Sequence, residues 1–326
     1  MGRHPRHEAA AFGAGEGVRT RNRRGPFAAV LVLWAAGAWA EGVSSRCVVV
    51  APSECLQVTI AGAGSDVVLI PGLFGSAFGF RRVLPLLVAQ GYRAIVIEPL
   101  GVGDSSRPAT ADYSLTAQAE RLRAVLDRLD AKEVILVSHS IGTSMALRLA
   151  WRDPGRIRAV VSLEGGPAEE VTTPSFRRAI KLAPLLKLLG AGRVIRGRVR
   201  GMLVSRSGDS SWVTDEIVRG YSEGAARDLG ATLDAFAQMS KARESEPLAP
   251  RLAELRCPVR LLLGTAPHEG GPTSEEIQTL QRSIASFGIT RVPGAGSFLF
   301  EEAPDAVVLA IREVVEAARL TLTANR

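Results

Sequence analysis

The chain has 326 residues, of which 46% are hydrophobic, and a formal net charge of +7. Residues 1–40 hold six arginines and two glutamates, so the remainder carries 34 basic and 31 acidic side chains. This distribution, with no basic motif containing interleaved aromatic residues, argues against a nucleic-acid-binding protein. The length suits one large core with an inserted cap, or two small domains.

The first 40 residues have the pattern of an export signal. Four arginines within residues 19–24 precede an apolar run over residues 27–39, which ends in Ala38, Trp39 and Ala40. This ending is typical of a signal-peptide cleavage site. We therefore expect residues 1–40 to be a leader and the mature protein to be exported to the periplasm or the medium. The alternative is an uncleaved anchor, although the run is short for a membrane span.

Two of the three cysteines flank a short turn. Residues 47–51 and 56–61 are predicted as a pair of strands, which brings Cys47 and Cys55 close together. In an oxidising compartment these thiols form a disulfide. Cys257 is left over and is expected to be buried before a strand.

Strand and helix signals alternate along the rest of the chain. Apolar runs predict further strands over residues 67–70, 94–97, 134–137, 159–163, 259–264 and 289–292. Helices are predicted over residues 81–90, 115–129, 144–151, 274–286 and 304–320. This alternation is typical of an α/β fold with a mostly parallel central sheet and helices on both faces.

The alternation stops over residues 164–256, where helical patterns occur without strands. We interpret this segment as a helical cap inserted into a core made of residues 41–163 and 257–326. An insertion after a strand of a parallel sheet is expected to lie over the strand ends, where ligands of such sheets bind.

Part of the predicted cap is strongly basic. Residues 171–208 contain no acidic side chain but nine basic ones, Arg177, Arg178, Lys181, Lys187, Arg193, Arg196, Arg198, Arg200 and Arg206. Such a stretch can be a lid with a solvated basic face above an apolar cleft. It can also contact an anionic membrane surface or guide an acidic or lipidic substrate. The small-molecule partner expected in the cleft is an acyl or lipidic compound.

The segment with the most chemical information follows the strand at 134–137. The strand leads into Ser138-His139-Ser140-Ile141-Gly142, and a predicted helix follows at once. In this context a small-x-Ser-x-Gly motif forms a nucleophile elbow, a tight turn that exposes the serine side chain. Ser140 is therefore the candidate nucleophile, and the Ile141 N–H is a candidate oxyanion donor.

Two further motifs stand in the order of a known family. Residues 71–75 read Pro-Gly-Leu-Phe-Gly after the third strand, and residues 98–105 read Glu-Pro-Leu-Gly-Val-Gly-Asp-Ser. With the elbow, they resemble the α/β-hydrolase family, which has His-Gly-x-x-Gly and Asp-x-x-Gly-x-Gly-x-Ser at these places. The resemblance implies that the Leu73 N–H is the second oxyanion donor.

The same resemblance shows that the usual base is absent. Residues 296–304 match the family pattern Gly-His-Phe-x-x-x-Glu-x-Pro, which places Ser297 at the position of the catalytic histidine. A serine hydroxyl is a weak nucleophile without a neighbouring base to take its proton. The resemblance therefore implies an incomplete or rearranged triad.

Two histidines remain after the leader. His139 adjoins the nucleophile, and we expect it to point away from the site as a structural residue. His268 lies in the loop where the family carries its acid, and it is either a solvated loop residue or a substitute base. In the second case a carboxylate would orient it, from Glu269, Glu301 or Glu302.

The triad acid is also displaced. After the strand at 259–264 the family pattern Gly-x-x-Asp reads Gly264 to Pro267, without an acid. Some family members carry their acid after the preceding strand, where this chain has Glu164. Glu164 is therefore a candidate acid, and helix capping or anchoring of the cap is the alternative.

These features predict an exported serine hydrolase that acts on an ester or related acyl compound through Ser140. No cofactor or metal is expected. The alternative is a catalytically silent binding protein that keeps the pocket of the fold but has lost its chemistry.

Overall fold

The computed structural model describes residues 42–172, 177 and 192–324, so the predicted leader lies outside the described residues. Its centre is a sheet of eight strands in which β1 pairs antiparallel with β2, β2 pairs antiparallel with β4, and the other pairs are parallel. In spatial order the strands are β1 Val43–Ala51, β2 Glu54–Ala61, β4 Tyr92–Ile97, β3 Ser65–Ile70, β5 Val134–His139, β6 Ile157–Leu163, β7 Val259–Gly264 and β8 Phe287–Val292.

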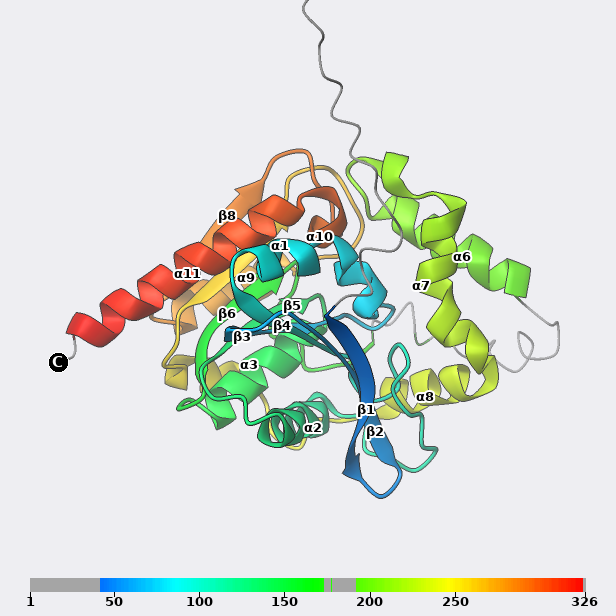
Figure 1. Cartoon of the computed structure of the whole chain (residues 1–326), viewed down its shortest axis with the longest axis horizontal. Coiled ribbons are helices and arrows are strands. Elements are labelled where there is room, and N and C mark those ends of the chain that lie inside the picture. Colours follow the sequence, from blue (N-terminus) through cyan, green and yellow to red (C-terminus); the bar gives the residue numbers. More distant parts are fainter. Residues whose placement is uncertain (1–41, 173–176, 178–191, 325–326) are drawn as a thin grey trace, which may run out of the picture. The chain divides into compact units, whose positions relative to one another are not determined.

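Helices cover both faces of this sheet (Figure 1). On one face, α1 (Leu84–Ala89) and α11 (Pro304–Ala324) contact each other and the strands. On the other face, α2 (Leu115–Arg128) packs against α3 (Gly142–Arg152), which contacts β5 and β6. Coverage on both sides explains why β3, β4 and β5 are apolar along nearly their whole length. The predicted fold class is confirmed.

The largest difference from the predicted elements lies at residues 81–90, where one helix was expected. The chain instead forms a 3₁₀ helix, η1 (Ala77–Arg82), followed by α1. Pro85 stands in the first turn of α1, where its missing N–H costs nothing. A short helix that was not predicted, α10 (Leu299–Glu302), precedes α11.

The segment between β6 and β7 is helical in its described part. It contains α6 Gly192–Ser205, η2 Ser210–Trp212, α7 Asp215–Arg227, α8 Leu229–Lys241 and η3 Ala249–Glu254. The helix α7 packs on η1, whereas η3 packs on α3 and α9 (Ser274–Ser283), with Leu252 buried in the main core. The last part of the insertion thus returns to the core before β7. Within the described ranges, no helix is both long and apolar enough to cross a membrane.

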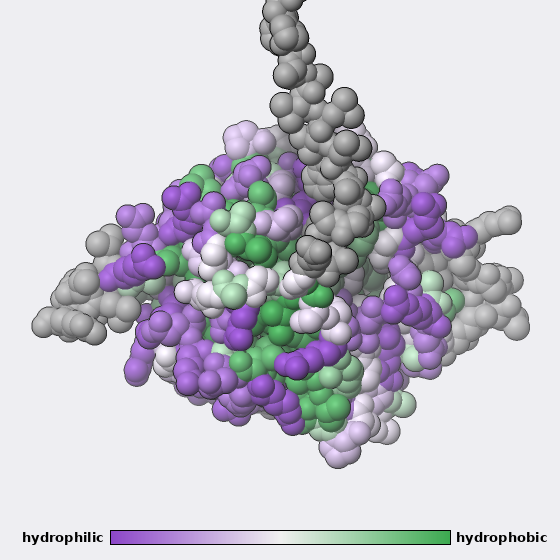
Figure 2. All heavy atoms as spheres, viewed as in Figure 1, coloured by the Kyte–Doolittle hydropathy of each residue, from purple (hydrophilic) through white to green (hydrophobic). Residues whose placement is uncertain are grey.

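The predicted basic stretch is only partly described, because residues 173–176 and 178–191 lie outside the described residues. Of its described arginines, Arg177 pairs with Glu170 and Arg200 pairs with Asp215. The face shown in Figure 2 is mostly hydrophilic, with a smaller hydrophobic area near its centre.

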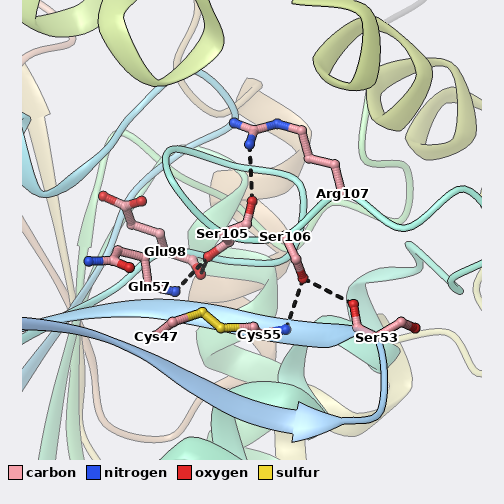
Figure 3. Close-up of a disulfide and its surroundings, with 8 residues drawn as sticks. All are labelled: Cys47, Ser53, Cys55, Gln57, Glu98, Ser105, Ser106 and Arg107. Carbon is pink, nitrogen blue, oxygen red and sulfur yellow. Dashed lines mark hydrogen bonds between the residues drawn. A yellow bond between two sulfur atoms is a disulfide. The ribbon is translucent and has the colours of Figure 1, made fainter. Parts of the chain in front are cut away.

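Cys47 on β1 and Cys55 on β2 are joined by a disulfide, with their Cα atoms 5.6 Å apart (Figure 3). In the hairpin register Cys47 lies opposite Gln57, two residues beyond Cys55, so the bridge runs diagonally between the strands. The loop after β4 rests on this hairpin through Ser106, whose Oγ accepts a 2.8 Å hydrogen bond from the Cys55 N–H. The bridge therefore holds together the hairpin that supports this loop.

We expect mass spectrometry of a non-reducing digest to find Cys47 and Cys55 linked and Cys257 as a free thiol. Cys257 is buried, and burial raises the pKa of its thiol to about 11, so it carries little thiolate at neutral pH. Replacing both Cys47 and Cys55 by serine should lower the free energy of unfolding by about 2 kcal/mol. Two alkylatable thiols at these positions in the native protein would contradict the prediction.

Candidate active site

Ser140 lies in the sharp turn between β5 and α3. Its backbone has a φ of +51°, a left-handed conformation that is uncommon for a residue with a side chain. A Cβ at Gly142 would come within 2.9 Å of the Ile70 carbonyl oxygen, and one at Gly165 would collide with the Ser140 carbonyl. A side chain at Gly142 within the turn, or at Gly165 after β6, would therefore clash with the backbone around Ser140, which fits the close packing of a nucleophile elbow.

Two backbone N–H groups beside Ser140 are free. The loop after β3 closes on itself through a hydrogen bond from the Gly75 N–H to the Gly72 carbonyl. A Cβ at Gly72 would lie 3.3 Å from Ser140 Cβ, so this loop packs directly on the elbow. In the described part of the structure, the N–H groups of Leu73 and Ile141 donate no hydrogen bond. Free donors beside the serine are what an oxyanion hole requires.

Ser140 lines a cavity of about 550 Å³, and residues 72–75 of the loop after β3 form another part of its wall. Much of its wall is apolar, from Leu73, Phe74, Ile141, Val171, Met202, Tyr221, Phe298 and Phe300. The size and the apolar wall suit a small organic ligand. Within the described residues, no group of three His, Cys, Asp or Glu side chains is placed to hold a metal ion.

His139 is one of the residues that border this cavity, and its side chain is buried. Its ring packs against Phe300, with centroids 4.9 Å apart, and Nε2 donates a 3.2 Å hydrogen bond to the Ser297 carbonyl. Burial, followed by the positive charge of Arg206, lowers the pKa of His139 to about 4. The ring is therefore neutral at neutral pH, and its Nε2 proton is committed to Ser297.

Ser297 is buried beneath the cavity wall. Its N–H donates a 2.7 Å hydrogen bond to the Arg206 carbonyl, and its Oγ lies 3.5 Å from His139 Nε2. The loop around it is held by Glu302, whose carboxylate accepts hydrogen bonds from the N–H groups of Gly208 and Gly296. In the described structure Ser140 Oγ has no hydrogen-bond partner, so nothing here replaces the family's histidine in direct contact with the serine.

Glu164 and His268 form a pair at the ends of β6 and β7. Glu164 has a φ of +54° and lines the cavity, and its Oε2 lies 3.3 Å from His268 Nε2. Its other oxygen accepts a hydrogen bond from the Gly264 N–H. The His268 Nδ1 atom donates to the Ala266 carbonyl at 2.8 Å, so a proton must also lie between Nε2 and Glu164. Burial raises the pKa of Glu164, which favours a shared proton.

This pairing corrects the expectation that Glu269, Glu301 or Glu302 orients His268. Glu301 is fully buried and pairs with Arg81 instead, while Glu302 holds backbone N–H groups. Both ring nitrogens of His268 face other groups in this structure. A role as the base for Ser140 would require the ring to leave Ala266 and Glu164.

Sequence reasoning missed two residues that line the cavity. Tyr221 on α7 donates a 2.7 Å hydrogen bond to Glu301, which joins the inserted helices to the core. No sequence pattern marks this tyrosine. Arg206 was visible only as one member of the basic stretch, and nothing in the pattern distinguishes it from its neighbours.

Comparisons with known proteins agree with the fold. Residues 67–188 match the model of the alpha/beta hydrolase fold family. The first curated relatives include an uncharacterized protein of Mycobacterium tuberculosis and are 32% identical to this chain over 153 residues. The match covers 44% of this chain and 44% of the relative, so the chain spans less than half of the length of these relatives. An epoxide hydrolase structure aligns with a TM-score of 0.71 at 18% identity, over 84% of this chain and 99% of that one.

A longer match is to a 2-hydroxy-6-oxononadienedioate/2-hydroxy-6-oxononatrienedioate hydrolase of Paraburkholderia xenovorans. It is 31% identical over 222 residues, which are 64% of this chain and 73% of the relative. The sheet order, the elbow and these matches lead to one conclusion: the chain belongs to the α/β-hydrolase fold family.

Proposed function

We propose that the protein is a serine hydrolase that acts on esters or related acyl compounds, with Ser140 as its nucleophile. The observation that carries this proposal is the combination of a left-handed Ser140 at a glycine-flanked turn and two free N–H groups beside it. In the reaction, Ser140 Oγ would attack the carbonyl carbon and lose its proton to water, and the Leu73 and Ile141 N–H groups would stabilise the resulting oxyanion. Collapse of this intermediate would break the bond to the leaving group, which departs with a proton from water, and a second water would hydrolyse the acyl-enzyme to the carboxylic acid and free Ser140.

The lack of a base beside Ser140 makes slow turnover the expected behaviour. An oxyanion hole and substrate binding alone still give about 10³- to 10⁴-fold acceleration over water when triad members are removed. In a rearranged triad Glu164 would be the acid and His268 the base. His268 could take this role only after its ring rotates away from the Ala266 carbonyl toward Ser140. The inserted helices α6, α7 and α8 would act as the cap of the cavity.

The second candidate function is binding without catalysis. It is favoured by one observation, that in the described structure Ser140 Oγ contacts no imidazole. Such a protein would use the same cavity and bind the same class of ligand, but it would not form a covalent acyl-enzyme.

Labelling by a fluorophosphonate distinguishes the two functions, because this reagent reacts with activated serines. We expect slow labelling of the wild type and none of Ser140→Ala. Ser211→Ala, which removes an exposed serine of η2, is the matched control and should be labelled like the wild type. Slow hydrolysis of short p-nitrophenyl esters should disappear with the same substitution. A wild type that resists labelling under all conditions would favour the binding protein.

We also propose that the protein is exported and that its leader is removed after Ala40. N-terminal sequencing of protein from an exporting host should begin at or near Glu41, because the Ala38-Trp39-Ala40 ending fits signal peptidase. Replacing Ala38 and Ala40 by bulky residues should leave the leader attached. Intact leader on cytoplasmic wild-type protein would refute the proposal.

A further inference from the structure

One charged side chain of the cavity has no partner in the described part of the structure. Arg206 follows α6 and is half-buried at the cavity wall. Its guanidinium makes no hydrogen bond or ion pair with a described residue. Burial lowers the pKa of Arg206, and the nearby Glu269 only partly offsets this effect. The guanidinium is therefore partly desolvated, and no described carboxylate lies within ion-pair distance of it.

The carboxylates that line the same cavity are already engaged. Their partners are His268 and the Gly264 N–H for Glu164, Arg148 for Glu169, Arg177 for Glu170, and the Thr273 N–H for Glu276. None of these acids pairs with Arg206. Among the described lining residues, Arg206 is thus the charged side chain left to meet a ligand.

The backbone of Arg206 contacts Ser297, the residue at the position of the family's catalytic histidine. Its carbonyl accepts a hydrogen bond from the Ser297 N–H, so the loops that hold the two residues lie side by side. Its charge reaches His139, whose pKa it lowers. An arginine cannot act as a base at neutral pH, since its guanidinium stays protonated. A cation that lines the cavity without an ion pair is suited to binding a negatively charged group.

We propose that Arg206 binds the carboxylate of an amphipathic acyl compound, whose apolar part lies against the apolar wall formed by residues such as Leu73, Met202 and Phe298. The substrate class is then an ester or related acyl compound that also carries a free carboxylate. The statement about the substrate rests on the proposed function, whereas the statement about binding does not.

The cavity favours a carboxylate over a phosphate. A guanidinium binds a carboxylate through two parallel N–H···O bonds, which neutralises a single charge. A phosphate dianion would leave charge and acceptor oxygens unmatched, because the described wall offers one free cation and is otherwise largely apolar.

Calorimetric titration with heptanoate and with its uncharged counterpart heptanamide tests this binding. The wild type and Ser140→Ala are expected to bind heptanoate roughly 10- to 100-fold more tightly than heptanamide, the range of a charge-assisted hydrogen bond. Arg206→Gln should lose this preference, and Arg206→Lys should keep part of it. Arg198→Gln removes an exposed arginine of α6, the helix that ends just before Arg206, and should behave like the wild type.

Equal affinity for the two ligands, no measurable binding of heptanoate, or a preference that survives Arg206→Gln would each overturn the inference. Circular dichroism should show that all variants are folded. If the preference is present while fluorophosphonate labelling fails, the serine-hydrolase function falls and the carboxylate site stands. If labelling succeeds without the preference, only the carboxylate site falls.

Discussion

Replacing Ser297 by histidine is expected to raise the rate of ester hydrolysis on the order of 100-fold. The loop already has the family's register at Gly296, Phe298 and Glu302, and Glu302 holds it through backbone N–H groups. An imidazole at this position would give Ser140 the general base that it lacks. The gain comes from proton transfer, because the elbow and the two free N–H groups are already present.

Two features of the structure limit this gain. Ser297 is buried beside His139, so a larger side chain has to displace neighbours, which typically costs about 1–3 kcal/mol of stability. The acid that would orient the new ring, Glu164, is paired with His268. Adding His268→Ala to the Ser297→His variant should free Glu164 and increase the rate further. His268→Ala alone should lower the wild-type rate only if that ring serves as the base.

The controls separate general-base catalysis from a change of shape. Ser297→Gln adds a side chain of similar length without a base and should give no gain. The Ser297→His rate should rise with pH through the ordinary imidazole pKa of about 6.5, because only the neutral ring accepts a proton. Rates that neither Ser297→His nor His268→Ala changes would mean that the acid is lost as well, and the chain would then be a binding protein.

The sheet and the elbow were predictable because they depend on local patterns. Apolar runs alternating with helices identify a parallel sheet covered on both faces, and a small residue on each side of Ser140 identifies a turn that tolerates close approach. Element ends were less predictable. Pro85 was a local signal for the start of α1, whereas the 3₁₀ helix η1 before it packs against α7 and α10, and no local pattern contains these contacts.

The polar partners at the site were not predictable for the same reason. Glu164 and His268 are 104 positions apart and meet only because β6 and β7 are neighbours in the sheet. The sequence suggested Glu269, Glu301 or Glu302 as the carboxylate that orients His268. In the structure Glu164 pairs with this histidine instead. Arg206 differs from the other described arginines of the basic stretch because it lines the cavity and its guanidinium pairs with no described residue. Both properties depend on the folded structure, so the sequence pattern could not single it out.

Replacing Arg148 by methionine is expected to lower the free energy of unfolding by about 3–5 kcal/mol, the usual effect of removing one partner from a buried ion pair. Arg148 on α3 is almost completely buried and forms ion pairs with Glu169 and Glu244. Glu169 accepts the N–H groups of Leu248 and Ala249, and Glu244 accepts those of Leu115 and Thr116. The arginine therefore fastens both ends of the inserted segment to the helix that starts at the elbow.

Guanidinium chloride unfolding of purified protein measures this effect. Arg152→Met is the matched control on the same helix, because its ion pairs with Glu120 and Glu246 are partly exposed and should be worth less than about 1 kcal/mol. Adding Glu169→Gln and Glu244→Gln to Arg148→Met should recover part of the loss, since no buried charge is then left unpaired. A loss no larger than that of Arg152→Met would show that water or nearby groups replace the arginine, and that the inserted segment is held to the core by its apolar contacts instead.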